Sequence, residues 1–230
     1  MSDTDGDKGI ITPEMPEHPQ GIGLALGGGL ARGFAHIGVL KVLQRENIRP
    51  SIITGTSIGA VVGASYLAGK LDYLEEWALS LNRMRVLSYL DFRGRSASMI
   101  GGKKLFRILE QNFKDMDIED LPVPYIAIAT DLLTGHEVWL RKGRLIDAMR
   151  ASFALPGVFP PVDRNHRLLV DGALVNPVPV APAQAMGARM TIGVDLNAEI
   201  LGKAAKPGQS YLTVAGFDLF NEADIPEATQ

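Results

Sequence analysis

The chain has 230 residues, 46% of them hydrophobic and 21% charged, which is an ordinary globular balance for one domain or two small ones. Its formal net charge of −3 provides no basic footprint for nucleic acid. The absence of cysteine excludes disulfides, thiol nucleophiles and zinc–thiolate sites. No apolar run reaches the roughly 18 residues that span a bilayer, so we expect at most peripheral membrane contact.

Residues 1–19 are acidic and interrupted by prolines, without a basic segment followed by an apolar core. This pattern predicts a disordered tail and not a signal peptide, and with the lack of cysteine it favours a cytoplasmic protein. Residues 20–200 are expected to form the structured domain, and 201–230 a C-terminal linker or tail with one weak apolar patch.

The first elements along the chain alternate between strand and helix. An apolar run predicts a strand at 21–26, helical spacing follows at 31–47, a second strand is expected at 48–55 and a second helix at 58–67. Both strands are apolar at successive positions, as is typical of a parallel sheet covered on both faces. The strand–helix–strand connection is expected to be right-handed.

The rest of the chain continues this mixture. In chain order we expect a helix at 71–81, a loop at 91–102, a helix at 103–113, a strand at 125–132 with a hairpin partner at 136–140, a helix at 144–154 and strands at 167–174 and 190–196. The sequence therefore predicts an α/β protein, with three α/β/α layers and a mainly parallel central sheet.

Ser57 lies between Gly55 and Gly59, where the second strand becomes the second helix. Gly-x-Ser-x-Gly at such a bend is typical of a nucleophile elbow, because glycines admit the strained turn and leave the hydroxyl beside a helix N-terminus. The alternative is a glycine-rich helix start in which Ser57 is only the capping residue.

Gly27, Gly28 and Gly29 follow the first strand and let several backbone N–H groups point at one spot, which suits an oxyanion or a phosphate. The spacing does not fit a dinucleotide fingerprint, because Arg32 stands where a glycine is needed. It does not fit a P-loop either, because Phe34 stands where lysine is needed. An oxyanion hole is favoured, since the first two strands are adjacent, and Arg32 adds charge nearby or pairs with a surface acid.

An activated serine needs a base, usually a histidine held by an acid. No histidine of this chain lies in a glycine-framed loop; the four are His18, His36, His136 and His166. Asp171 does lie in such a loop, at a strand end before Gly172, and an aspartate there can accept the serine proton directly. The alternative is that Asp171 only stabilises its turn.

Together these loops resemble the patatin-like phospholipase family. The blocks that carry the resemblance are Gly27 to Gly33, Gly55 to Gly59 and Asp171-Gly172-Ala173, with the intervening stretches "ATDLLTG" and "RASFALPGVFPPV". The similarity covers residues 20 to 197 and is closest to the small bacterial members. Those members usually continue past the last strand, so 201–230 is expected to be a truncated or divergent tail.

The resemblance implies a serine hydrolase that cleaves acyl esters of lipids through an acyl-enzyme, of phospholipase A, lysophospholipase or carboxylesterase type. Ser57 would be the nucleophile and Asp171 the general base, with no metal or cofactor. The partner would be a lipid or small ester, and the oligomeric state is left open.

The resemblance also implies a role for the glycine loop. The N–H groups of Gly28 and Gly29 would form the oxyanion hole, Gly27 would shape the loop, and Arg32 would occupy its basic position. Because one oxyanion donor is typically worth about 10²–10³ in rate, such a loop suits a weak carboxylate base.

Three alternative functions stay open. A catalytically silent lipid-binding or regulatory protein would keep the same fold without the reaction. An α/β-hydrolase triad would combine Ser57 with His166 and with Asp131 or Asp147, and a nucleotide-binding protein would use the glycine loop.

Overall fold

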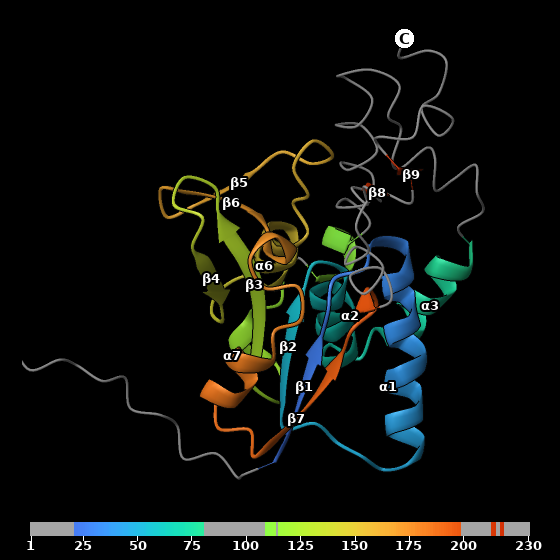
Figure 1. Ribbon diagram of the computed structural model, residues 1–230. Helices are drawn as coiled ribbons and strands as arrows, with labels where there is room; N and C mark the ends of the chain where they lie inside the picture. Colours follow the sequence, from blue (N-terminus) through green and yellow to red (C-terminus); the bar gives the residue numbers. More distant parts are fainter. Residues whose placement is uncertain (1–20, 81–108, 114, 199–212, 215–216, 219–230) are drawn as a thin grey trace, which may run out of the picture.

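The computed structural model describes residues 21–80, 109–113, 115–198, 213–214 and 217–218. Within these ranges the protein is built on a seven-stranded sheet of order β5-β6-β3-β2-β1-β7, with β4 paired to β3 (Figure 1). The tail expected at 1–19, the loop expected at 91–102 and most of the helix expected at 103–113 lie outside the described residues. Most of the expected tail at 201–230 lies outside them too.

The elements have the following bounds. The strands are β1 (Ile22–Leu26), β2 (Ile52–Thr56), β3 (Tyr125–Asp131), β4 (Glu137–Leu140), β5 (Val162–Arg164), β6 (Arg167–Asp171), β7 (Met190–Val194), β8 (Thr213–Val214) and β9 (Phe217–Asp218). The α-helices are α1 (Ala35–Arg45), α2 (Ile58–Leu67), α3 (Leu71–Ser80), α6 (Leu145–Ser152) and α7 (Val180–Ala185). Short 3₁₀ helices are η1 (Leu30–Phe34), η2 (Ile118–Asp120) and η3 (Gly172–Leu174).

Strands β7, β1, β2 and β3 pair in parallel, whereas β4 and β6 pair antiparallel with β3, and β5 pairs antiparallel with β6. The α/β class with a central sheet flanked by helices is confirmed. Leu26 is level with Gly55 and with Val194, so the neighbouring strands β1, β2 and β7 end at the same edge. In open α/β sheets this carboxyl edge is where ligands bind.

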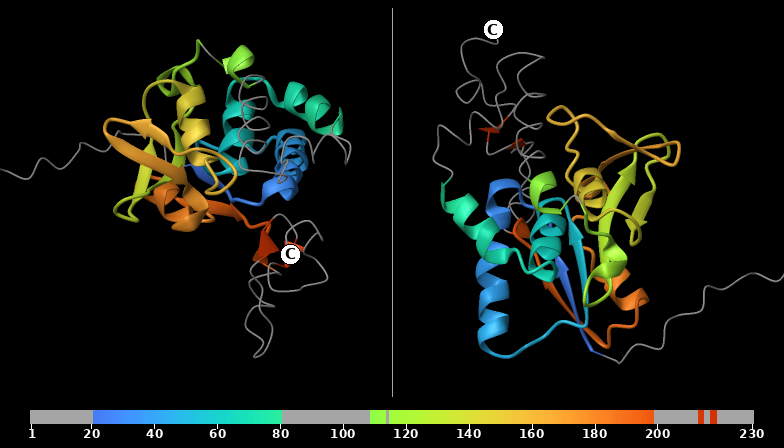
Figure 2. Two further views of the ribbon diagram at one scale, coloured as in Figure 1. Left: turned by 90° about the horizontal axis from the view of Figure 1, so that it is seen from above. Right: turned by 180° about the vertical axis from the view of Figure 1, so that it is seen from behind.

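The two faces of the sheet carry different helices, because side chains alternate along a strand. On one face, a Cβ atom at Gly23 would lie 3.1 Å from the Cβ of Ala183 in α7. On the other face, a Cβ atom at Gly63 of α2 would lie 3.0 Å from Cγ2 of Ile53. Seen from above, α1, α2 and α3 lie on one side of the sheet and α7 on the other (Figure 2).

The position of β6 is decisive for the site. β2 pairs with residues 125–128 of β3, β6 pairs with 129–131, and β4 pairs with 127–130. Because β4 overlaps both stretches, it occupies the other edge of β3, and β6 continues the line of β2 beyond its carboxyl end. This topology brings the end of β6, at Asp171, over the end of β2.

Helix α2 is the central helix, with Ile58 to Ser65 all buried. Its apolar surroundings are the sheet and the neighbouring helices, which explains why it lacks a polar face. Of the helices in the described ranges, none has both the length and the apolar character that crossing a bilayer requires.

Some of the expected element bounds need correction, and one helix was not expected. The helix expected at 31–47 is split into η1 and α1, because the chain leaves the glycine loop through Leu30 at φ 49° and an i→i−3 hydrogen bond from Arg32 N–H to Gly29. The strand expected at 167–174 ends at Asp171, whose carboxylate accepts the N–H of Ala173 and starts η3. Helix α7 was missed since its sequence contains Pro182, which is tolerated in a first helical turn.

The short strand β5 was also missed. It forms a hairpin with β6 across a turn at Asn165 and His166, whose φ angles are 52° and 62°. Two successive positive φ angles are the geometry of a tight hairpin turn. The polar residues of this turn indicated a turn but not the short strand before it.

Candidate active site

Ser57 occupies a sharp bend between β2 and α2. Its φ of 57° and ψ of −125° are strained for a residue other than glycine, and the residue is 3% exposed. The hydroxyl makes no capping hydrogen bond to α2. The interpretation of Ser57 as only a capping residue is therefore wrong, and the bend presents its Oγ for another contact.

The glycines on either side of Ser57 allow two close backbone approaches. A Cβ atom at Gly55 would lie 2.5 Å from the Cα of Ala60, and one at Gly59 would lie 2.1 Å from the carbonyl oxygen of Leu26. Neither distance is compatible with a side chain. The first turn of α2 thus packs directly against β2 and against the carboxyl end of β1, where the glycine loop begins.

Ser57 and Asp171 are in direct contact. Ser57 Oγ donates a hydrogen bond to Asp171 Oδ2 at 2.6 Å, and the other carboxylate oxygen accepts the N–H of Ala173 at 2.8 Å. Asp171 is 1% exposed. A Cβ atom at Gly172 would lie 2.3 Å from the carbonyl oxygen of Ile128, so glycine is needed after the aspartate for this loop to reach β3.

The environment of Asp171 tunes its acidity. Burial raises the pKa of Asp171 to about 6, and the hydrogen bonds from Ser57 and Ala173, which favour the carboxylate, partly oppose the rise. A carboxylate with this pKa is ionised at neutral pH and is a stronger base than an ordinary aspartate.

Buried threonines on the sheet hold the segment that carries Asp171. Thr130 Oγ1 donates to the carbonyl oxygen of Asp171 at 2.8 Å, and Thr56 Oγ1 donates to that of Asn176 at 2.8 Å. Thr54 Oγ1 donates to the carbonyl oxygen of Pro179 at 2.7 Å. The three hydroxyls fix the segment that follows β6 along β2 and β3.

The N–H groups of the glycine loop differ in availability. Gly27 N–H donates to the Val194 carbonyl at 3.0 Å, and Gly28 N–H donates to the Pro177 carbonyl at 2.9 Å. The expectation that Gly28 presents a free N–H needs correction, because its partner is this carbonyl. No described residue accepts the N–H of Gly29, which remains the candidate oxyanion donor of the three.

Two side chains fix the carbonyls of the same loop. His36 Nε2 donates to the Gly27 carbonyl at 2.8 Å, and Asn197 Nδ2 donates to the Gly28 carbonyl at 3.0 Å. Because a carbonyl only accepts, the Nε2 atom of His36 carries the proton. Burial lowers the pKa of His36 and outweighs the hydrogen bond to Gly27, which acts to raise it, so the neutral ring is favoured. Neither side chain was singled out for a role at the site, since both contacts depend on tertiary structure.

The other residues considered have different surroundings. Asp131 accepts the N–H groups of Leu133 and Thr134 in its own turn, and Asp147 pairs with Arg144 at 3.6 Å. The remaining residues are exposed and consist of Arg32 on η1, His136 before β4 and His166 in the β5–β6 turn. In the part of the chain that the structure describes, no histidine forms a hydrogen bond with Ser57.

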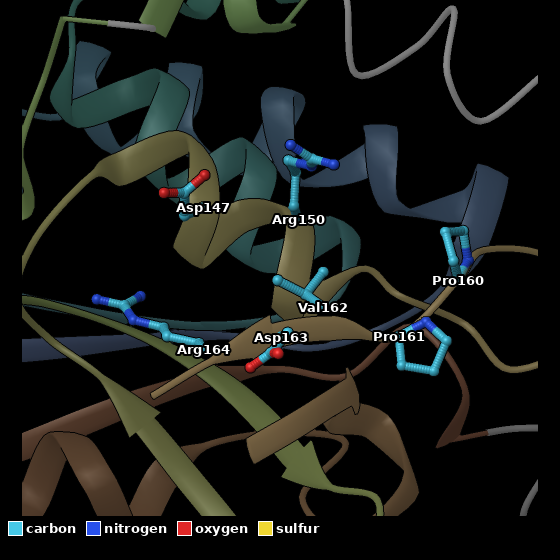
Figure 3. Close-up of a pocket in the computed structure, with 7 residues that line it drawn as sticks. All are labelled: Asp147, Arg150, Pro160, Pro161, Val162, Asp163 and Arg164. Atoms are coloured by element: carbon cyan, nitrogen blue, oxygen red, sulfur yellow. The ribbon is translucent and has the colours of Figure 1, made fainter. Parts of the chain in front are cut away.

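A hollow of about 340 Å³ lies between α6 and β5 (Figure 3). Its lining consists of Asp147, Arg150, Pro160, Pro161, Val162, Asp163 and Arg164. The guanidinium groups of Arg150 and Arg164 point away from each other (Figure 3), and neither Ser57 nor Asp171 lines the hollow. Within the described ranges, no three His, Asp or Glu side chains lie close enough together to hold a metal ion.

Comparison with known proteins places these loops in a family. The family model for patatin-like phospholipase matches residues 24–183. An uncharacterized NTE family protein of Mycobacterium tuberculosis is 43% identical over 183 residues, which are 80% of this chain and 51% of that protein. The chain thus spans about half the length of the mycobacterial relative.

More distant relatives include patatin-like phospholipase domain-containing protein 6 of Homo sapiens, 35% identical over 77% of this chain and 13% of that protein. Neuropathy target esterase sws of Drosophila melanogaster is 34% identical over the same two shares, 77% and 13%. Among solved structures, VipD from Legionella pneumophila has a TM-score of 0.49 and 13% identity, covering 69% of this chain and 47% of that chain. The family model and the sequence relatives establish that the chain belongs to the patatin-like phospholipase family.

Proposed function

We propose that this protein is a serine hydrolase that cleaves acyl esters of lipids through a Ser57–Asp171 dyad and an acyl-enzyme. The observation that carries the proposal is the 2.6 Å hydrogen bond between Ser57 Oγ and Asp171 Oδ2 at a buried, strained elbow. A serine paired with a base in this way is the pattern of nucleophilic catalysis. Family membership supports a lipid ester as the substrate class.

In the proposed reaction, Ser57 Oγ attacks the ester carbonyl carbon while Asp171 Oδ2 accepts the hydroxyl proton. The C–O bond to the leaving alcohol then breaks, and the alcohol takes the proton from Asp171. Water attacks the acyl-enzyme in the second half, transferring its proton to Asp171, and the released Ser57 oxygen recovers a proton from the same carboxyl. Asp171 thus alternates between base and acid, which its pKa of about 6 favours near neutral pH.

The negative charge that develops on the carbonyl oxygen needs hydrogen-bond donors. Gly29 N–H is the proposed donor from the glycine loop, and the N-terminus of α2 contributes its positive dipole end beside Ser57. Gly27 and Gly28 are proposed to shape the loop, and Arg32 is proposed to add positive charge near its entrance. No step of this proposal requires a metal or cofactor.

A fluorophosphonate probe and a short p-nitrophenyl ester test the dyad. Wild type and His166→Ala are expected to label and hydrolyse, because His166 lies in an exposed turn. Ser57→Ala and Asp171→Asn are expected to do neither at a comparable rate. Loss of activity in His166→Ala would favour a triad, and a folded wild type without labelling would favour a lipid-binding protein without catalysis.

The type of lipid ester is tested separately with the active protein. Phosphatidylcholine, lysophosphatidylcholine and a short neutral ester, each at matched concentration, distinguish phospholipase A, lysophospholipase and carboxylesterase activity. Presenting the phospholipid in vesicles and in detergent micelles shows whether a membrane surface alters the rate. Adding a second alcohol and measuring the transfer product distinguishes hydrolysis from acyl transfer.

A further inference from the structure

Ser152, the last residue of α6, contacts the backbone of the nucleophile. Ser57 N–H donates a hydrogen bond to Ser152 Oγ at 2.9 Å, although the two residues are 95 positions apart in the sequence. Ser152 is 0% exposed. No glycine precedes or follows it in the way that glycines surround Ser57, and its hydroxyl is not presented at a strained turn.

This hydrogen bond falls on the most strained residue of the site. Ser57 adopts φ 57°, an orientation that persists only where the surrounding structure holds it. A buried N–H without an acceptor is strongly unfavourable, so the position of Ser152 Oγ determines how the Ser57 peptide group can turn. The contact is with the backbone of Ser57 and leaves the Ser57 hydroxyl available to Asp171.

The segment that begins at Ser152 also holds the other half of the pair. Asp171 N–H donates to the carbonyl oxygen of Ala154 at 2.9 Å. Residues 152–154 therefore bind the backbones of both Ser57 and Asp171, which come from different elements. Close by, the rings of Phe153 and Phe159 pack with their centroids 5.4 Å apart, which supports the turn after α6.

We infer that Ser152 is a positioning residue whose hydroxyl sets the distance between Ser57 Oγ and Asp171 Oδ2. The inference rests on the proposed function, because it assigns Ser152 a role in the reaction of that pair. Ser152 acts through the backbone of Ser57. Residues 152–154 hydrogen-bond to the backbones of both the nucleophile and the base, and so fix their positions relative to each other.

The direct test is Ser152→Ala, measured by steady-state kinetics on a short p-nitrophenyl ester between pH 5 and pH 9. We expect kcat to fall about 10- to 100-fold, because small misplacements of reacting groups have effects of this size, while KM stays close to the wild-type value. The acid limb of the pH profile should move to higher pH, since the Ser57 hydrogen bond is one of the contacts that lower the pKa of Asp171.

Ser65 supplies the matched control. It is also a fully buried serine, and its Oγ donates to the Val61 carbonyl at 2.8 Å within α2. Ser65→Ala removes a buried hydroxyl without touching Ser57 or Asp171, so kcat and the acid limb should stay at their wild-type values. Ser152→Cys is a second test that preserves side-chain size and leaves only a weak acceptor, which protects the experiment if the alanine variant does not fold.

The outcomes separate the inference from the proposed function. A folded Ser152→Cys or Ser152→Ala variant with wild-type kcat and an unmoved acid limb would overturn the inference. An equal loss in Ser65→Ala would also overturn it, because any buried hydroxyl would then have the same effect. Failure of wild type to hydrolyse the ester or to label would instead refute the proposed function itself.

Discussion

Replacing Asp171 with asparagine is expected to stabilise the fold while removing the proposed base. Burial raises the pKa of Asp171 from an ordinary 3.8 to about 6. Each tenfold change in proton affinity is worth about 1.4 kcal/mol, so holding the carboxylate in this site costs about 3 kcal/mol above pH 6. Asparagine has nearly the same shape, accepts the Ala173 N–H and carries no charge, so most of this penalty should disappear.

The sign depends on pH in a defined window. Because the folded-state pKa of Asp171 is raised, its contribution to stability is most favourable below the ordinary value of 3.8 and is lost as pH rises through about 6. Urea unfolding of both proteins should therefore give nearly equal free energies at pH 4. At pH 8 the Asp171→Asn protein should be more stable by about 1–3 kcal/mol, while ester hydrolysis falls sharply.

Asp131 provides a control of opposite sign. Burial acts to raise its pKa, but the N–H groups of Thr134 and Leu133, the Thr134 hydroxyl and Arg167 outweigh it, so the pKa of Asp131 is lowered. Asp131→Asn should therefore reduce stability at pH 8, with the loss shrinking as pH falls below the ordinary aspartate value. The reasoning about Asp171 would be refuted if Asp171→Asn were less stable than wild type at pH 8, or if the difference did not vary with pH.

Three further predictions follow from the site. The kcat/KM of ester hydrolysis should be half-maximal at about pH 6 and level above it, because Asp171 must be ionised to accept a proton. Gly59→Ala should prevent folding, since its Cβ would lie 2.1 Å from a β1 carbonyl oxygen, whereas Gly38→Ala on α1, with no atom within 4 Å, should gain about 1 kcal/mol in urea unfolding. His36→Ala should lower kcat by releasing the Gly27 carbonyl, and His36→Gln, which retains a donor, should lower it less.

Each of these has a contrary outcome. If kcat/KM were constant between pH 5 and pH 8, the ionisation of Asp171 would not control the rate, and its proposed role as the base would be contradicted. A Gly59→Ala protein as stable as Gly38→Ala would contradict the close approach of α2 to β1. Equal kinetics in wild type and His36→Ala, measured with thermal unfolding as a check on folding, would show that the orientation of the glycine loop does not depend on this side chain.

The sequence alone predicted the features that depend on local pattern. Successive apolar positions and helical spacing identified the α/β class, and the helix expected at 58–67 has the bounds of α2. The glycines around Ser57 predicted a sharp bend, because tight backbone turns have few alternatives in residue type. Ser57 and Asp171 could be singled out because each lies in a short glycine-framed loop at a strand end.

Only the tertiary structure decided how those loops are held. Asp171 reaches Ser57 because β6 is antiparallel and continues the line of β2 along β3, and strand direction is not encoded in the apolar pattern of a single strand. Ser152, His36 and Asn197 contact the site over separations of 95, 9 and 169 residues, through hydrogen bonds to backbone atoms. Such contacts leave no local sequence signal, because any backbone N–H or carbonyl offers the same chemistry and only the folded chain selects which one lies within reach.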